Sequence, residues 1–276
     1  MRARCAALAL LALIATTLTA ALAEPVRAPA PAPVLPVRVE KRLPHDPDAF
    51  TQGLVFHQGE LLESTGLYRR STLRRTDPET GRVLALARLP GTLFAEGLAL
   101  CPERPGQRPR LVLLTWREGL ILTYDAASLK RLSTHRLRGQ GWGLAWDGTR
   151  LILSDGTDSL RLLAPDGFAE TGQVKVRDGA QPVRELNELE WAEGWLLANV
   201  WGLDRIAVIR PPGARHAGQV AAWLDLSALR RELGPQAETA NGLAYDARAK
   251  ALYVTGKRWD TVFVLALPAP LSTPPD

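Results

Sequence analysis

The sequence predicts an all-β fold, a five-bladed β-propeller with four antiparallel strands in each blade. A short phrase returns five times, at intervals of 44, 46, 45 and 54 residues, beginning at Gln52, Glu96, Trp142, Asn187 and Asn241. A steady period near this length is typical of a solenoid or a propeller. Each phrase is followed by short apolar runs bounded by Gly, Asp and Pro and without helical spacing, which indicates strands. Four such runs per repeat make a propeller blade, whereas solenoid repeats of this length would be largely helical.

The first 23 residues have the pattern of a signal peptide. Arg2 and Arg4 supply the charged start, residues 6–22 form an uncharged apolar run, and a small-x-small cleavage pattern ends the segment. The alternative is a membrane anchor, but an apolar run of about 17 residues is marginal for crossing a bilayer. We therefore expect an exported protein, periplasmic or extracellular.

The chain between this segment and the first repeat divides into two parts. Residues 24–36 alternate Pro with small residues, which is typical of an extended linker. Residues 37–43 have strand character, while the fifth repeat has only three strands of its own. We expect residues 37–43 to pair there as the missing outer strand, which closes the ring and removes its exposed edges.

The longer fourth interval has a local cause in a predicted helix over residues 225–234. Ser227 is its expected N-cap and Gly234 its expected end. The propeller domain is predicted over residues 37–267, with a Pro-rich tail over residues 268–276.

Composition excludes several classes of protein. The chain has 276 residues, of which 46% are hydrophobic and 23% charged, ordinary values for a globular protein. Its net charge of +5 falls to +3 without residues 1–23, too small a surplus to indicate nucleic-acid binding. Cys101 is the one cysteine after that segment, so the exported protein has no internal disulfide, and four His leave little material for a zinc cluster.

The five phrases place an unusual set of side chains around one mouth of the channel, because the first strand of each blade lies nearest the axis. The ring presents a carboxylate, three amides and an indole, where a purely structural ring would repeat one small or apolar residue. Polar groups gathered in a concave site are costly unless they are paired or used. The ring therefore predicts a functional site.

Strand ends beside the ring extend this pattern. Trp116 and Trp201 end second strands in polar, loop-like contexts, and an aromatic box around Glu96 would raise its pKa toward neutrality, as an acid–base group requires. A lysine at a strand end is usually solvated, but Lys257 is a candidate donor to an amide oxygen that becomes negative during attack. Four other tryptophans are assigned to the core instead: Trp146, Trp191, Trp195 and Trp223.

Other chemistries lack their signatures. No G-x-S-x-G elbow is present, so a serine hydrolase has no recognisable nucleophile. The glycine-rich stretch over residues 139–143 leads into a strand instead of the helix that a nucleotide loop requires. No pair of histidines has zinc-ligand spacing.

Several long motifs resemble the plant and bacterial glutaminyl-peptide cyclotransferases. They are PHDPDAFTQGL at residues 44–54, LNELEW at 186–191, ANVWGLDRI at 198–206, WLDLS at 223–227 and VTGKRW at 254–259. The resemblance spans about residues 40–267 and implies a five-bladed propeller, unrelated to the zinc-dependent animal glutaminyl cyclases.

The resemblance also implies a reaction, in which an N-terminal glutaminyl residue closes its α-amine onto its own γ-carboxamide and releases ammonia. Glu96 would bind the α-amine and carry its proton to the leaving nitrogen. Asn187 and Lys257 would bind the γ-amide oxygen, and Gln52 would orient the substrate amide. The apolar box would consist of Phe50, Phe94, Trp116, Trp142 and Trp201. No role is assigned to Asn241.

The resemblance implies no metal at the site and no cofactor for catalysis; a structural ion on the channel axis remains open. The expected partners are peptides or proteins with an N-terminal Gln, with no nucleic acid, no membrane contact after signal removal, and a monomeric enzyme. One departure, the charged stretch Arg117-Glu118-Gly119 after Trp116, leaves the preference for the residue after Gln open.

Two alternatives belong to other classes of protein. A metal-dependent, lactonase-like propeller hydrolase would hold its ion with Glu96, Asn187 and Asn241, but a single carboxylate among the ring positions is weak for a hard divalent cation. A non-catalytic, envelope-binding propeller is the second alternative. Sensitivity of a lactonase activity to a chelator would identify the first, and activity on a Gln-initiated peptide would exclude the second.

Overall fold

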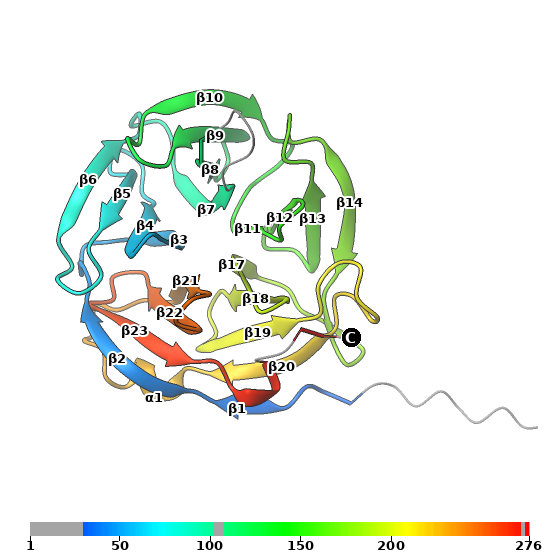
Figure 1. Cartoon of the computed structure of the whole chain (residues 1–276). Coiled ribbons are helices and arrows are strands. Elements are labelled where there is room, and N and C mark those ends of the chain that lie inside the picture. The colour runs from blue at the N-terminus through cyan, green and yellow to red at the C-terminus, as the bar shows by residue number, and fades with distance from the viewer. Residues whose placement is uncertain (1–29, 102–107, 272–273, 276) are drawn as a thin grey trace, which may run out of the picture.

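The computed structural model describes residues 30–101, 108–271 and 274–275, and in them the chain forms a ring of five blades around a central axis (Figure 1). Each blade is a sheet of four antiparallel strands, as predicted. Blade 1 holds β3 (Thr51–His57), β4 (Glu60–Thr65), β5 (Thr72–Thr76) and β6 (Val83–Arg88). Blade 2 holds β7 (Ala95–Cys101), β8 (Arg110–Thr115), β9 (Leu120–Asp125) and β10 (Arg131–Arg136). Blade 3 holds β11 (Leu144–Trp146), β12 (Leu151–Leu153), β13 (Ser159–Leu163) and β14 (Glu170–Lys175).

The last two blades contain strands from both ends of the chain. Blade 4 holds β17 (Leu186–Ala192), β18 (Trp195–Val200), β19 (Arg205–Ile209) and β20 (Val220–Asp225). Blade 5 holds β21 (Ala240–Asp246), β22 (Ala251–Gly256), β23 (Thr261–Ala266) and, as its outer strand, β2 (Arg38–Pro44). The antiparallel pairing of β2 with β23 confirms the predicted closure of the ring by an N-terminal strand, seen in Figure 1 as blue beside red.

Short elements lie outside this plan. The strand β1 (Val34–Pro36) pairs in parallel with β20, so the last residues of the predicted linker form a strand on blade 4. A small hairpin joins β15 (Arg177–Asp178) to β16 (Gln181–Pro182), and a 3₁₀ turn, η1, spans Ala269–Leu271. The predicted signal peptide lies outside the described residues, and the domain limits stay a prediction.

The inserted helix is shorter than predicted and begins differently. The helix α1 spans Ser227–Arg230, so its predicted end at Gly234 is wrong. Its N-cap is Leu226 and not Ser227, and no side chain caps it. The Asp225 carboxylate instead accepts the backbone N–H of Ser227 at 3.0 Å, which ties the helix start to the end of β20.

Five apolar clusters hold the blades together, one in each interface between neighbours. They arise because the inner strands are buried on both faces and therefore carry nearly continuous apolar runs. The clusters differ greatly in size: the interface between blades 4 and 5 buries 19 apolar residues, whereas that between blades 5 and 1 buries seven. We call the interface between blades 5 and 1, where the ring closes, the closing seam.

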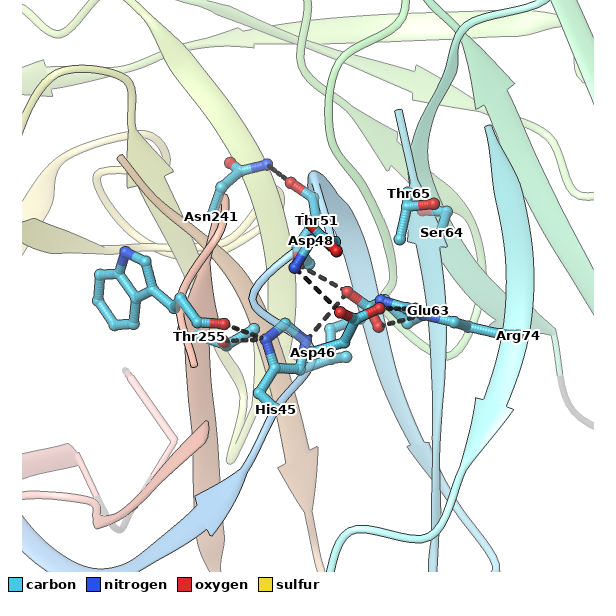
Figure 2. A network of polar contacts seen from close by, with 12 residues as sticks. His45, Asp46, Asp48, Thr51, Glu63, Ser64, Thr65, Arg74, Asn241 and Thr255 are labelled. Atoms are coloured by element: carbon cyan, nitrogen blue, oxygen red, sulfur yellow. Dashed lines mark hydrogen bonds and ion pairs between the residues drawn. The ribbon is translucent and has the colours of Figure 1, made fainter. Parts of the chain in front are cut away.

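The closing seam contains a buried polar network in addition to its small apolar cluster (Figure 2). The Glu63 carboxylate accepts hydrogen bonds from Arg74 Nε at 2.8 Å and Thr51 Oγ1 at 2.6 Å, and lies 3.2 Å from His45 Nε2. Arg74 Nη1 also donates to Asp46 Oδ2 at 2.8 Å. These five residues, His45, Asp46, Thr51, Glu63 and Arg74, are called the seam network below.

Charge pairing sets the ionisation of the seam network. Burial alone would raise the pKa of Glu63, but Arg74 and His45 together hold it well below its usual range. Burial alone would lower the pKa of His45, and the Glu63 carboxylate overcomes this and raises it. Because the Trp259 carbonyl oxygen accepts from His45 Nδ1 at 2.7 Å, both ring nitrogens are donors and the imidazole is held as a cation.

No helix in the described part of the chain is long and apolar enough to cross a membrane.

Candidate active site

A pocket of about 430 Å³ opens at one mouth of the channel. It contains all nine residues that the sequence predicted for the site: Phe50, Gln52, Phe94, Glu96, Trp116, Trp142, Asn187, Trp201 and Lys257. Residues up to 207 positions apart in the chain therefore line one cavity, because each blade contributes the start of its first strand or the end of its second. Their chemical roles stay a prediction at this point.

Two polar residues of the site have their backbone fixed by a serine of the preceding blade. Glu96 and Asn187 lie near the starts of β7 and β17, and both are buried. The carbonyl oxygen of Glu96 accepts from Ser64 Oγ of blade 1 at 2.6 Å, and that of Asn187 accepts from Ser154 Oγ of blade 3 at 2.6 Å. A hydroxyl from the preceding blade thus fixes the backbone of each of these two residues.

Glu96 is the only carboxylate at the ring positions and is 5% exposed. Burial raises its pKa well above the usual range, the Lys257 ammonium opposes this shift, and the Glu118 carboxylate adds to it. Burial correspondingly lowers the pKa of Lys257, although Glu96 opposes the change. The two groups influence one another, and each is poised to exchange a proton more readily than it would in water.

Aromatic rings form the wall around these groups. The Phe94 ring lies 6.3 Å from Phe50 and 5.4 Å from Trp116, measured between centroids. Lys257 Nζ lies 5.0 Å from the Phe50 ring centroid, within cation–π range. A Cβ at Gly156, whose φ is +82°, would approach the Trp142 ring to 2.7 Å, so this position needs glycine for both conformation and space.

The outer rim of the pocket is partly apolar and partly charged. Trp201 is 53% exposed, and Tyr68 is exposed against Phe94 at 5.4 Å. Glu118 accepts from the Tyr68 hydroxyl at 2.9 Å, and the Arg117 guanidinium stacks on the Trp116 ring at 3.8 Å. The charged stretch noticed in the sequence therefore lies at the mouth of the pocket.

Two ring-associated residues do not line the pocket. Asn241 is fully buried behind Gln52, and Trp259 is fully buried with its indole N–H donated to the Glu238 carbonyl oxygen at 2.9 Å. The tryptophans assigned to the core behave in two ways: Trp195 and Trp223 are buried, whereas Trp146 and Trp191 are partly buried against apolar clusters.

Sequence reasoning missed Leu67 and Glu238, which also line the pocket. Leu67 lies two residues beyond the end of β4, close to the position in blade 1 that Trp116 occupies in blade 2. Extending the strand-end rule to blade 1 would have found it. Glu238 precedes β21 in a loop, and nothing in the sequence singles it out; its carboxylate pairs with Arg258 Nε at 3.0 Å.

Within the described residues, no group of three or more His, Cys, Asp or Glu side chains could hold a metal ion. The ligand set expected for the lactonase-like alternative is also not assembled, because Asn241 turns away from the pocket that Glu96 and Asn187 share.

The propeller thus carries a buried carboxylate with a raised pKa, a lysine and amide donors inside an aromatic wall, a combination suited to acid–base chemistry on a small polar group. Comparison with known proteins narrows this chemistry to one family. The family model described as glutamine cyclotransferase matches residues 9–267, and the chain belongs to this family.

Two relatives support the assignment. A glutaminyl-peptide cyclotransferase of Arabidopsis thaliana is 39% identical over 238 residues, which cover 84% of this chain and 71% of that protein. The crystal structure of Myxococcus xanthus glutaminyl cyclase is 38% identical and superposes with a TM-score of 0.75, covering 85% of this chain and 97% of the other. The family predicted from the sequence motifs is therefore confirmed.

Proposed function

We propose that this chain is a glutaminyl-peptide cyclotransferase, which converts N-terminal glutaminyl residues of peptides and proteins to pyroglutamate and releases ammonia. Membership of the glutamine cyclotransferase family supports this activity. The observation that carries the assignment of the site is the buried Glu96 carboxylate, enclosed with Lys257 in an aromatic pocket large enough for one side chain.

Binding places the two reacting ends of the substrate together. The glutaminyl side chain enters the pocket and folds so that its α-amine approaches its own γ-carboxamide carbon. Because both groups belong to one residue, the pocket only has to select the folded conformer, and an aromatic wall that excludes water does so. The phenyl and indole faces of Phe50, Phe94 and Trp142 supply that wall.

Glu96 carries the proton. Its carboxylate pairs with the substrate α-ammonium, takes a proton from it, and frees the lone pair that attacks the γ-carbon. The new N–C bond forms a tetrahedral intermediate, and Glu96 gives the proton to the carboxamide nitrogen. The C–N bond then breaks to release ammonia as the oxyanion re-forms the carbonyl. The Glu96 carboxylate takes the second proton from the ring nitrogen, which leaves the lactam N–H, and passes that proton to the released ammonia. A carboxyl group whose pKa is raised by burial suits both halves of this transfer.

Asn187 and Lys257 stabilise the charge that develops on the γ-carboxamide oxygen. Both side chains are buried, line the pocket and can donate to an oxyanion. Gln52 orients the same amide. None of these steps needs a covalent enzyme intermediate or a cofactor.

We also propose that the enzyme is exported, with residues 1–23 removed as a signal peptide, and that it acts as a monomer on peptides or proteins in the periplasm or outside the cell. Expression of the full chain in a bacterial host, followed by N-terminal sequencing of the periplasmic fraction, tests this point. A mature N-terminus at residue 24 is expected, and an uncleaved chain in the cytosol would contradict it.

The direct test of function is incubation of the protein with a Gln-initiated peptide, followed by mass spectrometry. Loss of one ammonia from the N-terminus is expected, and a matched Asn-initiated peptide serves as control because its shorter side chain cannot form the five-membered lactam. No mass change on a panel of Gln-initiated peptides would refute the proposed function.

A further inference from the structure

Asn241 occupies a ring position but contacts Gln52 instead of the pocket. It is fully buried near the start of β21, and its side-chain nitrogen donates to two oxygens. One is the backbone carbonyl oxygen of Thr51 at 3.1 Å, and the other is Gln52 Oε1 at 3.0 Å. Gln52 itself lines the pocket.

The chemistry of these two contacts determines which way both amides point. A backbone carbonyl oxygen only accepts hydrogen bonds, so the Asn241 atom beside Thr51 must be the nitrogen. Its second N–H then requires an acceptor, which fixes the oxygen of the Gln52 amide on that side. Because the amide group is planar, Gln52 Nε2 points away from Asn241 when Gln52 Oε1 faces it.

The free end of the Gln52 amide therefore presents donors to the substrate. Among the described residues Gln52 Nε2 has no hydrogen-bond partner, and it is not one of the atoms sealed from solvent without a partner. We propose that Asn241 is a positioning residue that locks the Gln52 amide with its N–H groups toward the γ-carboxamide oxygen of the substrate. This proposal rests on the proposed function of the pocket.

The Thr51 carbonyl that orients Asn241 is itself firmly held. The side chain of Thr51 donates to Glu63 within the seam network, and Figure 2 shows Asn241 and Thr51 joined above that network. Two successive hydrogen bonds thus link the closing seam to a pocket residue. The orientation of Gln52 follows from a fixed backbone group and not from chance rotation of an amide.

A residue needed only for packing would not have these properties. Asn241 Oδ1 is buried without a partner, and leaving such an atom unpaired usually costs about 1–3 kcal/mol. An apolar residue of similar size would avoid that cost but could not orient Gln52. An aspartate would place an acceptor against two oxygens and favour rotation of the Gln52 amide, with its oxygen toward the substrate.

The test is a double-mutant cycle measured as kcat and KM on a Gln-initiated peptide, with Tm recorded for every protein. The set comprises the wild type, Asn241→Ala, Gln52→Ala and the double variant. Asn241→Ala is expected to lower kcat about tenfold in the wild type and less than about twofold when Gln52 is already Ala, because it acts through that side chain. Losses that multiply in the double variant, or a single loss below about twofold, would overturn the proposal.

Asn199→Ala is the matched control. Asn199 is equally buried, and its Oδ1 accepts from the backbone N–H of Gly242, next to Asn241, at 3.0 Å. Its substitution is expected to lower Tm, and any change in kcat should be the same with and without Gln52. Coupling to Gln52 as strong as that of Asn241 would show a general structural effect and overturn the specific role.

Gln52→Glu keeps the proposal testable if Asn241→Ala does not fold. A carboxylate still accepts from Asn241 but offers no donor to the substrate, so kcat should fall at least tenfold while Tm stays unchanged. A kcat within twofold of wild type would overturn the orientation argument. Wild-type turnover in the same assay separates the two claims: an inactive wild type refutes the proposed function, whereas an active wild type with multiplicative losses refutes only the role of Asn241.

Discussion

Glu63 in the closing seam and Glu96 in the pocket are both buried glutamates on inner strands, yet their surroundings drive their pKa values in opposite directions. Glu63 is 2% exposed and hydrogen-bonded to Arg74, with His45 beside it. Its pKa is held well below the usual range. Glu96 is 5% exposed, forms no ion pair within 4 Å in the described part of the chain, and has a raised pKa.

The difference lies in the distance and number of counter-charges. A buried carboxylate with two cations in hydrogen-bond contact stays ionised and cannot exchange its proton at ordinary pH, so it serves structure. A buried carboxylate whose one cation, Lys257, is near but not in contact keeps an adjustable proton. The closing seam thus combines a small apolar cluster with fully paired charges, whereas the pocket leaves its charge available for substrate.

Removal of β2 should have the largest effect on the structural side of this comparison. Deleting residues 37–43 strips blade 5 of its outer strand and should abolish cooperative thermal unfolding. Leu43→Ala is a milder form, because Leu43 is buried in the closing seam, and should cost about 2–5 kcal/mol. Leu132→Ala, at an exposed position in blade 2, is the control for Leu43→Ala and should leave Tm unchanged. If the deletion of residues 37–43 left Tm unchanged, the proposed ring closure by β2 would be wrong.

Glu63→Gln should destabilise the protein without removing the chemistry. The change leaves His45 without its carboxylate and Arg74 with Asp46 alone. Breaking a buried pair costs about 3–5 kcal/mol, which lowers Tm by roughly 6–20 °C in a domain of this size. Circular dichroism melts measure this loss. Turnover per folded molecule should fall less than tenfold, and a larger fall at an unchanged Tm would contradict the division of roles.

The seam network also predicts a pH window of maximum stability. Because the pKa of Glu63 is lowered on folding, its contribution is complete above its unfolded pKa of about 4.3 and is lost as pH falls. Because the pKa of His45 is raised on folding, its contribution is complete below about 6.5 and is lost as pH rises. The network should therefore stabilise most between about pH 5 and 6.5.

Melting temperatures of wild type and His45→Gln across pH 5 to 9 check this window. Stability also falls over this pH range because burial raises the pKa of Glu190 to about 8. Both proteins share that loss of stability, so the difference between their melting temperatures isolates the contribution of His45. That difference should shrink as pH rises above about 6.5. A difference that grows with pH would show that His45 is not the cation assigned to the network.

The smallest effect should come from a chelator. Cyclisation by the folded protein should be unchanged after treatment with EDTA and dialysis, because the proposed proton and oxyanion steps use side chains alone. Thermal melts of the same sample report any structural ion separately from activity. Complete loss of turnover that zinc restores would favour a metal-dependent reaction.

The fold could be predicted from the sequence because each blade repeats the same pattern of residues. Five copies of one phrase gave the blade number, and the short fifth repeat left a place for β2. The predicted position of the helix after β20 is correct, but its predicted limits are wrong. The Asp225 carboxylate accepts from the backbone N–H of Ser227, and Ser227 lies inside the helix instead of capping it. Local signals identify an element more reliably than they fix its ends.

The pocket followed from the same repetition, because equivalent positions in a closed ring must converge. What repetition could not supply were contacts specific to one blade. The bond from Asn241 to Gln52 joins residues 189 positions apart, and Glu63 pairs with Arg74 and His45, which lie 11 and 18 positions away. These contacts depend on side-chain directions in a single interface. Glu63 in particular lies in an ordinary strand sequence with nothing to mark it as buried and paired.

Glu96→Gln, assayed beside Glu190→Gln, tests the central claim most directly. Both changes remove an acidic proton from a carboxyl with a raised pKa while keeping its shape. Glu190, however, lies three residues beyond Asn187 on β17 and lines a separate cavity. The predicted result is a fall in kcat of about 10²–10⁴ for Glu96→Gln with an undiminished Tm, and less than a twofold change for Glu190→Gln. A fall of less than about tenfold for Glu96→Gln would contradict its role as the proton carrier.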